Sequence, residues 1–164
     1  MIRCEVFELN VRELCDDQRT ILVELRTDLP IGTECVVAAE RRYKNRRGDE
    51  CVWVLHDDGI TVNPIRNSVL NGFGLRINVD ECDQNARDEF DEISSPGDHV
   101  MNDITEAVSI TAVVPIRQRN KSFGKNNLNL VGSAVREVNR MRTIEAVQSV
   151  VCPVRGEFLP KTNA

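Results

Sequence analysis

Apolar and polar residues alternate along most of this chain, so that every second side chain is apolar. Two clear runs are Leu75, Ile77 and Val79, and Val108, Ile110, Ala112, Val114 and Ile116. Because successive side chains of a strand point to opposite faces, this period of two predicts strands with one buried and one wet face. The pattern predicts an antiparallel β-protein and does not by itself identify a function.

Turn residues divide the pattern into short strands. Pro30 fixes its own φ and Gly32 accepts a positive φ, which predicts a turn at 28–32. Asp57-Asp58-Gly59 also has the composition of a tight turn, and Asn139-Arg140 fits a hairpin turn although it lacks glycine. The predicted strands are Cys4–Val11, Arg19–Thr27, Glu34–Tyr43, Glu50–His56, Ile60–Asn63, Leu75–Val79, Glu106–Arg117, Gly132–Val138 and Met141–Val154.

The period changes in the segment that follows residue 80. Cys82, Ala86, Phe90 and Ile93 recur at intervals of three and four, which predicts an amphipathic helix. Acidic residues at its start suit the positive end of a helix dipole. The run Ser-Ser-Pro-Gly at 94–97 predicts where this helix ends.

Eight or nine short strands with one short helix predict an all-β fold, an antiparallel β-sandwich that is immunoglobulin-like in architecture. The Cys–Trp–Cys core of immunoglobulin domains cannot be assigned, because Trp53 has Cys51 beside it and no second cysteine at the required spacing. No linker or repeat divides the chain of 164 residues. We therefore expect one domain over 1–154 and a polar C-terminal tail over 155–164 that frays.

The cysteines bear on the cellular compartment. Six of them, at 4, 15, 35, 51, 82 and 152, are widely spaced without a CxxC pair, and four lie in apolar strand patterns. We expect reduced, mostly buried thiols, with three disulfides or a zinc site as alternatives. Neither a signal peptide nor an apolar span of about 20 residues is found. With Met1 as the natural start, the expected location is cytoplasmic.

Two segments of the chain are strongly basic. Residues 41–47 hold five cations around one tyrosine, and residues 117–125 hold four cations around one phenylalanine. Cations beside an aromatic ring can hold phosphates while a base stacks on the ring, although solvated hairpin tips also collect charge. The candidate binding residues are Arg41, Arg42, Tyr43, Lys44, Arg46, Arg47, Arg117, Arg119, Lys121, Phe123 and Lys125.

Residues 80–98 carry the opposite charge. They hold eight acids against Arg87 alone, a local net charge of −7. Asp80, Asp83, Asp88 and Asp91 suggest a cation site, but the segment lacks the central glycine and terminal bidentate acid of a calcium loop. We expect a solvated helix face, with an acidic docking surface or a cover over one end of the sandwich as alternatives.

His56-Asp57-Asp58 is the grouping that most resembles a catalytic site, because a histidine beside carboxylates can act as a base or bind a metal. No GxSxG or HExxH motif accompanies it, and His99 lies in another predicted loop. The glycines at 72 and 74 precede a strand, and the Gly-Lys pair at 124–125 lacks the rest of a phosphate loop. No cofactor or metal is predicted.

These observations favour a non-enzymatic β-sandwich interaction module that binds a protein partner. The alternative is a nucleic-acid or polyanion binder that uses the basic segments 41–47 and 117–125. A hydrolase or metal site around His56 is a minor third hypothesis.

Overall fold

The computed structural model describes residues 1–14, 19–93 and 101–156, which form two antiparallel sheets, a small parallel pair and one helix. The five-stranded sheet has the order β10 (Arg136–Val138), β11 (Met141–Val151), β8 (Ala107–Val114), β4 (Glu34–Lys44) and β5 (Glu50–Thr61). The four-stranded sheet has the order β2 (Phe7–Glu13), β3 (Thr20–Thr27), β7 (Asn71–Asn78) and β6 (Asn63–Pro64). The predicted antiparallel, mostly β fold is confirmed, and neither sheet closes on itself.

One hydrophobic core receives side chains from both sheets. The predicted alternation is seen directly in β8, where Val108, Ile110, Ala112 and Val114 are buried and the residues between them are half-buried. The apolar residues buried from β3 and β4 are Ile21, Val23, Leu25, Cys35, Val37 and Ala39. Aliphatic side chains therefore provide most of this core, which suits a pleated sheet surface.

β5 is longer than the predicted strand. Asp57, Asp58 and Gly59 do not form a turn but continue the pairing with β4 as far as Thr61. The register shifts between Ala39 and Glu40, where Leu55 is the extra residue of a β-bulge. Residues that are common in turns are tolerated in this strand because the backbone of β4 pairs with theirs along one edge.

The predicted hairpin at Asn139-Arg140 is confirmed. Val138 of β10 pairs with Met141 of β11, so the turn contains two residues. Both turn residues have positive φ, 51° for Asn139 and 63° for Arg140. This is the backbone of a type I′ turn, whose twist matches that of the adjoining strands.

The N-terminal segment forms a separate parallel pair. β1 (Ile2–Arg3) pairs with β9 (Leu130–Val131), next to two short 3₁₀ turns at Lys121–Phe123 and Lys125–Asn127. Gly132 follows β9 with φ +125°, and a Cβ there would lie 2.1 Å from the carbonyl oxygen of Cys4. Only glycine allows the two backbones to approach so closely.

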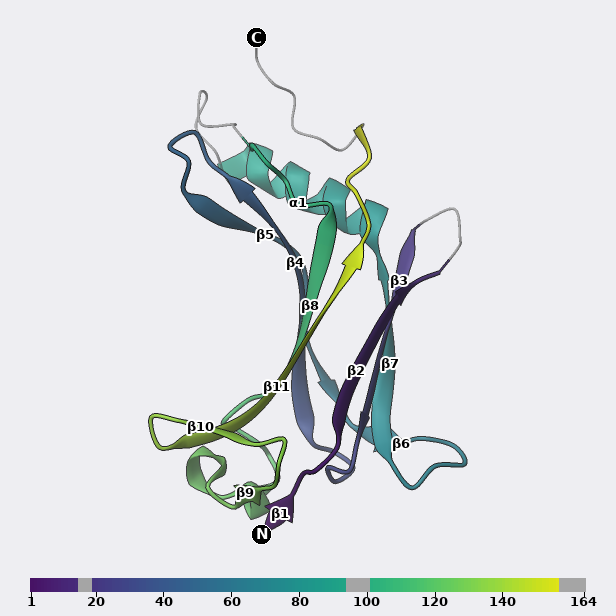
Figure 1. Cartoon of the computed structure of the whole chain (residues 1–164), viewed down its shortest axis with the longest axis vertical. Helices are drawn as coiled ribbons and strands as arrows, with labels where there is room; N and C mark the ends of the chain where they lie inside the picture. The colour runs from purple at the N-terminus through teal and green to yellow at the C-terminus, as the bar shows by residue number, and fades with distance from the viewer. Residues whose placement is uncertain (15–18, 94–100, 157–164) are drawn as a thin grey trace.

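The predicted helix is α1 (Val79–Ile93), which follows β7 directly. The Asn78 side-chain oxygen accepts a hydrogen bond from the backbone N–H of Glu81 at 3.1 Å, which caps the first turn. Figure 1 shows α1 lying across one end of the two sheets, while β1, β9 and β10 lie at the opposite end. Within the described ranges, no helix has the length and apolar character needed to cross a bilayer.

Two predictions fall outside the described residues. These are the end of the helix at 94–97 and most of the polar tail, from residue 157 onward.

Candidate functional site

The first basic segment is divided between a strand and a turn. The residues that belong to β4 rather than to a loop are Arg41, Arg42, Tyr43 and Lys44. Asn45 closes the following turn, because its side-chain oxygen accepts hydrogen bonds from the backbone N–H groups of Arg47 and Asp49, both at 2.9 Å. Arg46 and Arg47 are exposed at this tip.

Nearby acids pair with two of the cations in this segment. Arg42 reaches Glu50 at 3.3 Å and Glu40 at 3.4 Å. Lys44 Nζ lies 3.8 Å from a carboxylate oxygen of Asp103. Pairs this exposed contribute little to stability, but they lower the positive potential that a polyanion would meet.

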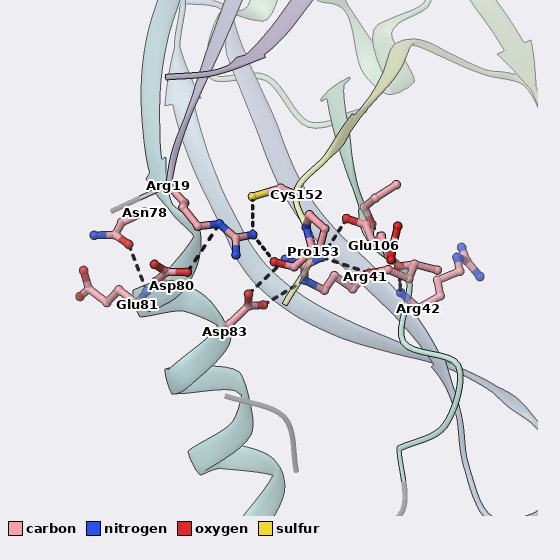
Figure 2. A network of polar contacts seen from close by, with 12 residues as sticks. Arg19, Arg41, Arg42, Asn78, Asp80, Glu81, Asp83, Glu106, Cys152 and Pro153 are labelled. Atoms are coloured by element: carbon pink, nitrogen blue, oxygen red, sulfur yellow. Dashed lines mark hydrogen bonds and ion pairs between the residues drawn. The ribbon is translucent and has the colours of Figure 1, made fainter. Parts of the chain in front are cut away.

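Arg41 is fully buried, contrary to the expectation that it grips a phosphate at the surface. Its Nε and Nη2 donate to the two carboxylate oxygens of Asp83 at 3.0 and 3.1 Å. Its Nη1 donates to the carbonyl oxygens of Thr105 and Glu106 at 3.0 and 3.2 Å. The Arg41 side chain has no exposed surface, so no external ligand can reach it. Figure 2 shows its contacts with Asp83 of α1 and with the chain around Glu106.

The expectation of a fully solvated helix face is wrong at Asp83, because its side chain has no exposed surface. Burial raises the pKa of this carboxyl, and the Arg41 guanidinium opposes that rise. A bidentate pair with both oxygens occupied is the arrangement in which a buried carboxylate remains charged.

A second set of contacts fastens the start of α1. Asp80 lies between Arg19, at 3.9 Å, and Arg155, at 3.2 Å. Arg19 also donates from Nη2 to the Cys152 sulfur at 2.9 Å and to the carbonyl oxygen of Pro153 (Figure 2). The first turns of the helix are thus joined to the chain that follows β11.

The second basic segment also differs from expectation. Phe123 is 1% exposed and belongs to the core, so no nucleic-acid base can stack on it. Arg119 reaches Glu34 at 3.0 Å from an otherwise exposed position. Arg117, Lys121 and Lys125 are exposed.

The two basic segments do not share a surface. Figure 1 places the β4–β5 tip beside α1, at one end of the long axis, and the 3₁₀ turns at the other end. Five acids of α1 are exposed at the same end of the molecule as the first segment, namely Glu81, Asp88, Glu89, Asp91 and Glu92. The fold therefore does not combine the basic segments into one phosphate-binding face.

His56 is half-buried in β5 and pairs with Ala39 across the sheet. His99 lies outside the described residues, so the structure does not test a site that joins the two histidines. Within the described part of the chain, no three histidine, cysteine or acidic side chains form a group that could hold a metal ion.

The described cysteines are free thiols, and three of the four assigned to apolar strand patterns are buried. Cys4, Cys35 and Cys152 are at most 1% exposed, whereas Cys51 and Cys82 are half-buried and Cys15 lies outside the described residues. Burial raises the pKa of Cys4 and Cys35 to about 12. Thiols with such a pKa are protonated near neutral pH and do not act as nucleophiles.

A hollow of about 190 Å³ lies between α1 and β5. Its lining residues are Tyr43, Val52, Trp53, Val54, Ala86, Glu89, Phe90, Ile93 and Met101. Small-molecule sites usually measure about 300–1,000 Å³, so this hollow suits a single apolar side chain better than a cofactor.

The lining combines a rigid floor with an exposed apolar rim. Trp53 is 2% exposed, and Tyr43 and Phe90 meet edge to face with ring centroids 6.1 Å apart. The rim is open, since Val54 is 52% exposed and Ile93 is 76% exposed. Such aromatic contacts hold the floor in place without any ligand.

No protein-family model, curated protein or solved structure matches this chain. Among the described residues, the hollow between α1 and β5 combines a buried aromatic floor, an exposed apolar rim and neighbouring exposed acids, and it is the candidate site.

Sequence reasoning missed this site, although one signal was present. Cys51–Leu55 is an uninterrupted apolar run, which is typical of a strand covered on both faces. Cys51, Trp53 and Leu55 are alternate residues of this run, and Val52 and Val54 between them also belong to the hollow's lining.

Proposed function

We propose that this chain is a non-enzymatic β-sandwich, immunoglobulin-like in architecture, that binds a protein partner in the cytoplasm through the hollow between α1 and β5. Two sheets that share one core support the sandwich assignment. The observation that carries the function is the exposed apolar rim of Val54 and Ile93 beside the acids of α1. An apolar centre with a charged rim is the composition of a protein-docking site.

The favoured partner is a peptide segment with an apolar side chain flanked by basic residues. Glu89 lines the hollow, and Asp88 and Glu92 are exposed nearby on the same helix. These acids attract lysine or arginine and repel a nucleic-acid backbone. Arg41 and Phe123, which the polyanion hypothesis needs at the surface, are buried.

The experiment is a selection of random 12-residue peptides displayed on phage against the wild-type protein, followed by titration of the selected synthetic peptides. Trp53 is the only tryptophan of the chain and lines the hollow, so its fluorescence reports occupancy directly. We expect selected peptides to contain an apolar residue next to basic ones, and to shift the Trp53 emission.

The matched variants are Val54→Lys and Val147→Lys, because both valines are 52% exposed on the five-stranded sheet and only Val54 lines the hollow. Substitutions at exposed positions change stability by about 0.5 kcal/mol or less, so both variants should fold. Val54→Lys should abolish binding and Val147→Lys should preserve it. Peptides that bind both variants equally, or a selection that yields no binder, would overturn the proposal.

A further inference from the structure

β5 forms one outer edge of the five-stranded sheet. It pairs with β4 on one side only, and no described residue hydrogen-bonds the backbone of Glu50–Val54 on the other side. An unpaired strand edge presents N–H and C=O groups that can accept another strand.

The two halves of this edge differ in how they are protected. Beyond the bulge at Leu55, β5 carries Asp57 and Asp58, and charges and bulges of this kind normally prevent strand addition. Between Glu50 and Val54 the edge has neither bulge nor proline, and its exposed side chains include Val52 and Val54. This half is therefore competent for pairing.

The hollow lies at this unprotected half. Val52, Trp53 and Val54 line it from the strand, and Ala86, Phe90 and Ile93 line it from the helix. Figure 1 shows the outer part of the β4–β5 hairpin lying alongside α1. A strand added to β5 would thus have backbone partners on one side and the helix on the other.

We propose that the partner peptide binds by strand addition: it extends along Glu50–Val54, pairs with the β5 backbone, and places one apolar side chain in the hollow. This inference rests on the proposed function and specifies its mode. A five-residue edge is about 17 Å long and pairs with a peptide of similar length. Backbone hydrogen bonds supply affinity, and alternate side chains supply specificity.

The charge around the edge argues against a second copy of this chain as the occupant. Pairing two β5 edges would bring two α1 helices together, each with exposed Asp88, Glu89 and Glu92. Like charges brought together at an interface disfavour that complex. A peptide with basic residues beside its apolar anchor meets the same acids favourably.

The test uses the peptides selected above, each made in two N-methylated series. One series methylates the odd-numbered residues and the other the even-numbered residues, so the side chains and charges stay the same. In an added strand, only one of the two sets of N–H groups faces β5. We expect one series to bind at least about tenfold more weakly, while the other binds within about twofold of the parent, because an unmade hydrogen bond is costly.

The outcomes separate the two proposals. Equal binding by both series, or equal loss in both, would overturn strand addition while leaving the docking site in place. The absence of any selected peptide contradicts the proposed function itself. Hydrogen exchange gives an independent readout: the bound peptide should protect amides within Glu50–Val54, and should leave exchange in the opposite edge strand, β10, unchanged.

Discussion

Arg41 and Asp83 meet in a fully buried bidentate pair, with donor–acceptor distances of 3.0 and 3.1 Å. One residue belongs to a strongly basic segment and the other to a strongly acidic one. The two carbonyl oxygens of Thr105 and Glu106 complete the guanidinium's contacts. This pair joins α1 to β4, and both elements contribute residues to the lining of the hollow.

The first prediction concerns this pair. Arg41→Met should lower the free energy of unfolding by about 3–5 kcal/mol, because it leaves the Asp83 carboxylate buried without its partner. The double variant Arg41→Met/Asp83→Leu should recover most of that loss, since it leaves neither charge behind. Urea unfolding followed by circular dichroism gives the free energy of unfolding of the wild type, the single variant and the double variant.

The neighbouring Arg42→Met provides the control, because the Arg42 side chain is 51% exposed. Its effect should stay within about 0.5 kcal/mol. A loss below about 1 kcal/mol for Arg41→Met would show that the pair does not hold the helix.

The sequence contained enough information to place both members of this pair inside. A period of two puts Arg41 on the same face of β4 as Cys35, Val37 and Ala39, and these three are buried. Asp83 follows Val79 by four residues and precedes Ala86 by three, so it lies on the buried stripe of α1. Local charge density predicts exposure for both residues, whereas periodicity predicts burial, and the structure agrees with the periodicity.

Other features had no such local signal. Phe123 lies in a polar loop without periodicity, and tertiary packing alone buries it. The hollow joins residues of β5 and α1 with Met101, which are far apart in the chain, so only the docking of the helix creates it. Strand positions and the helix were predictable because their periods are local properties of the backbone.

The second prediction concerns the thiols. At pH 8, Cys4 and Cys35 in the native protein should not react with an aromatic disulfide reagent, because burial raises the pKa of each to about 12. The reactive species is the thiolate, which is scarce well below the pKa. Cys51, which is half-buried, should react.

After unfolding without a reductant, all six cysteines of the chain should react. Two or fewer free thiols would indicate disulfides and an oxidising compartment, and would contradict the proposed cytoplasmic location.

The third prediction is a pH dependence. Glu5 accepts hydrogen bonds from the hydroxyl and backbone N–H of Ser133 at 2.5 and 2.9 Å, and these contacts lower the pKa of Glu5 below 4.5. A lowered pKa favours the ionised form in the folded state. The stabilisation is therefore present above pH 4.5 and is lost as the pH falls through the lowered value.

Carboxyl carbon NMR titration should give Glu5 a pKa below 4.5, and Ser133→Ala should move it upward. Ser149→Ala, at an exposed position of β11, should leave the pKa of Glu5 unchanged. An unaltered titration in Ser133→Ala would mean that the serine contacts do not form in solution.

The fourth prediction concerns the β10–β11 turn. Arg140 has φ +63°, a conformation that costs a non-glycine residue about 1–2 kcal/mol. Arg140→Gly removes that cost but adds backbone entropy to the unfolded chain, so we expect a net gain of about 0.5–1 kcal/mol. Arg136→Gly, in the extended backbone of β10, should instead lose about 0.5–1 kcal/mol. Thermal unfolding of the two variants should therefore shift in opposite directions, and equal shifts would argue against a type I′ turn.

The last prediction decides between a protein and a polyanion as the partner. Arg46 and Arg47 are the exposed cations at the β4–β5 tip, and the exposed acids of α1 lie at the same end of the molecule. An approaching phosphate backbone meets both signs of charge, and the second basic segment lies too far away to help. We expect no gel shift of single- or double-stranded oligonucleotides at tens of micromolar protein in low salt.

Replacing Arg46 and Arg47 by alanine should then change neither the mobility of the oligonucleotides in the gel nor the shift of Trp53 emission by a selected peptide. A polyanion binder would behave differently: it would shift the oligonucleotide, weaken steeply as salt rises, and lose part of that salt dependence when the two arginines are removed. That combination would favour the tip as the functional surface. An unchanged peptide titration in the same double-alanine protein would keep the hollow as an independent site.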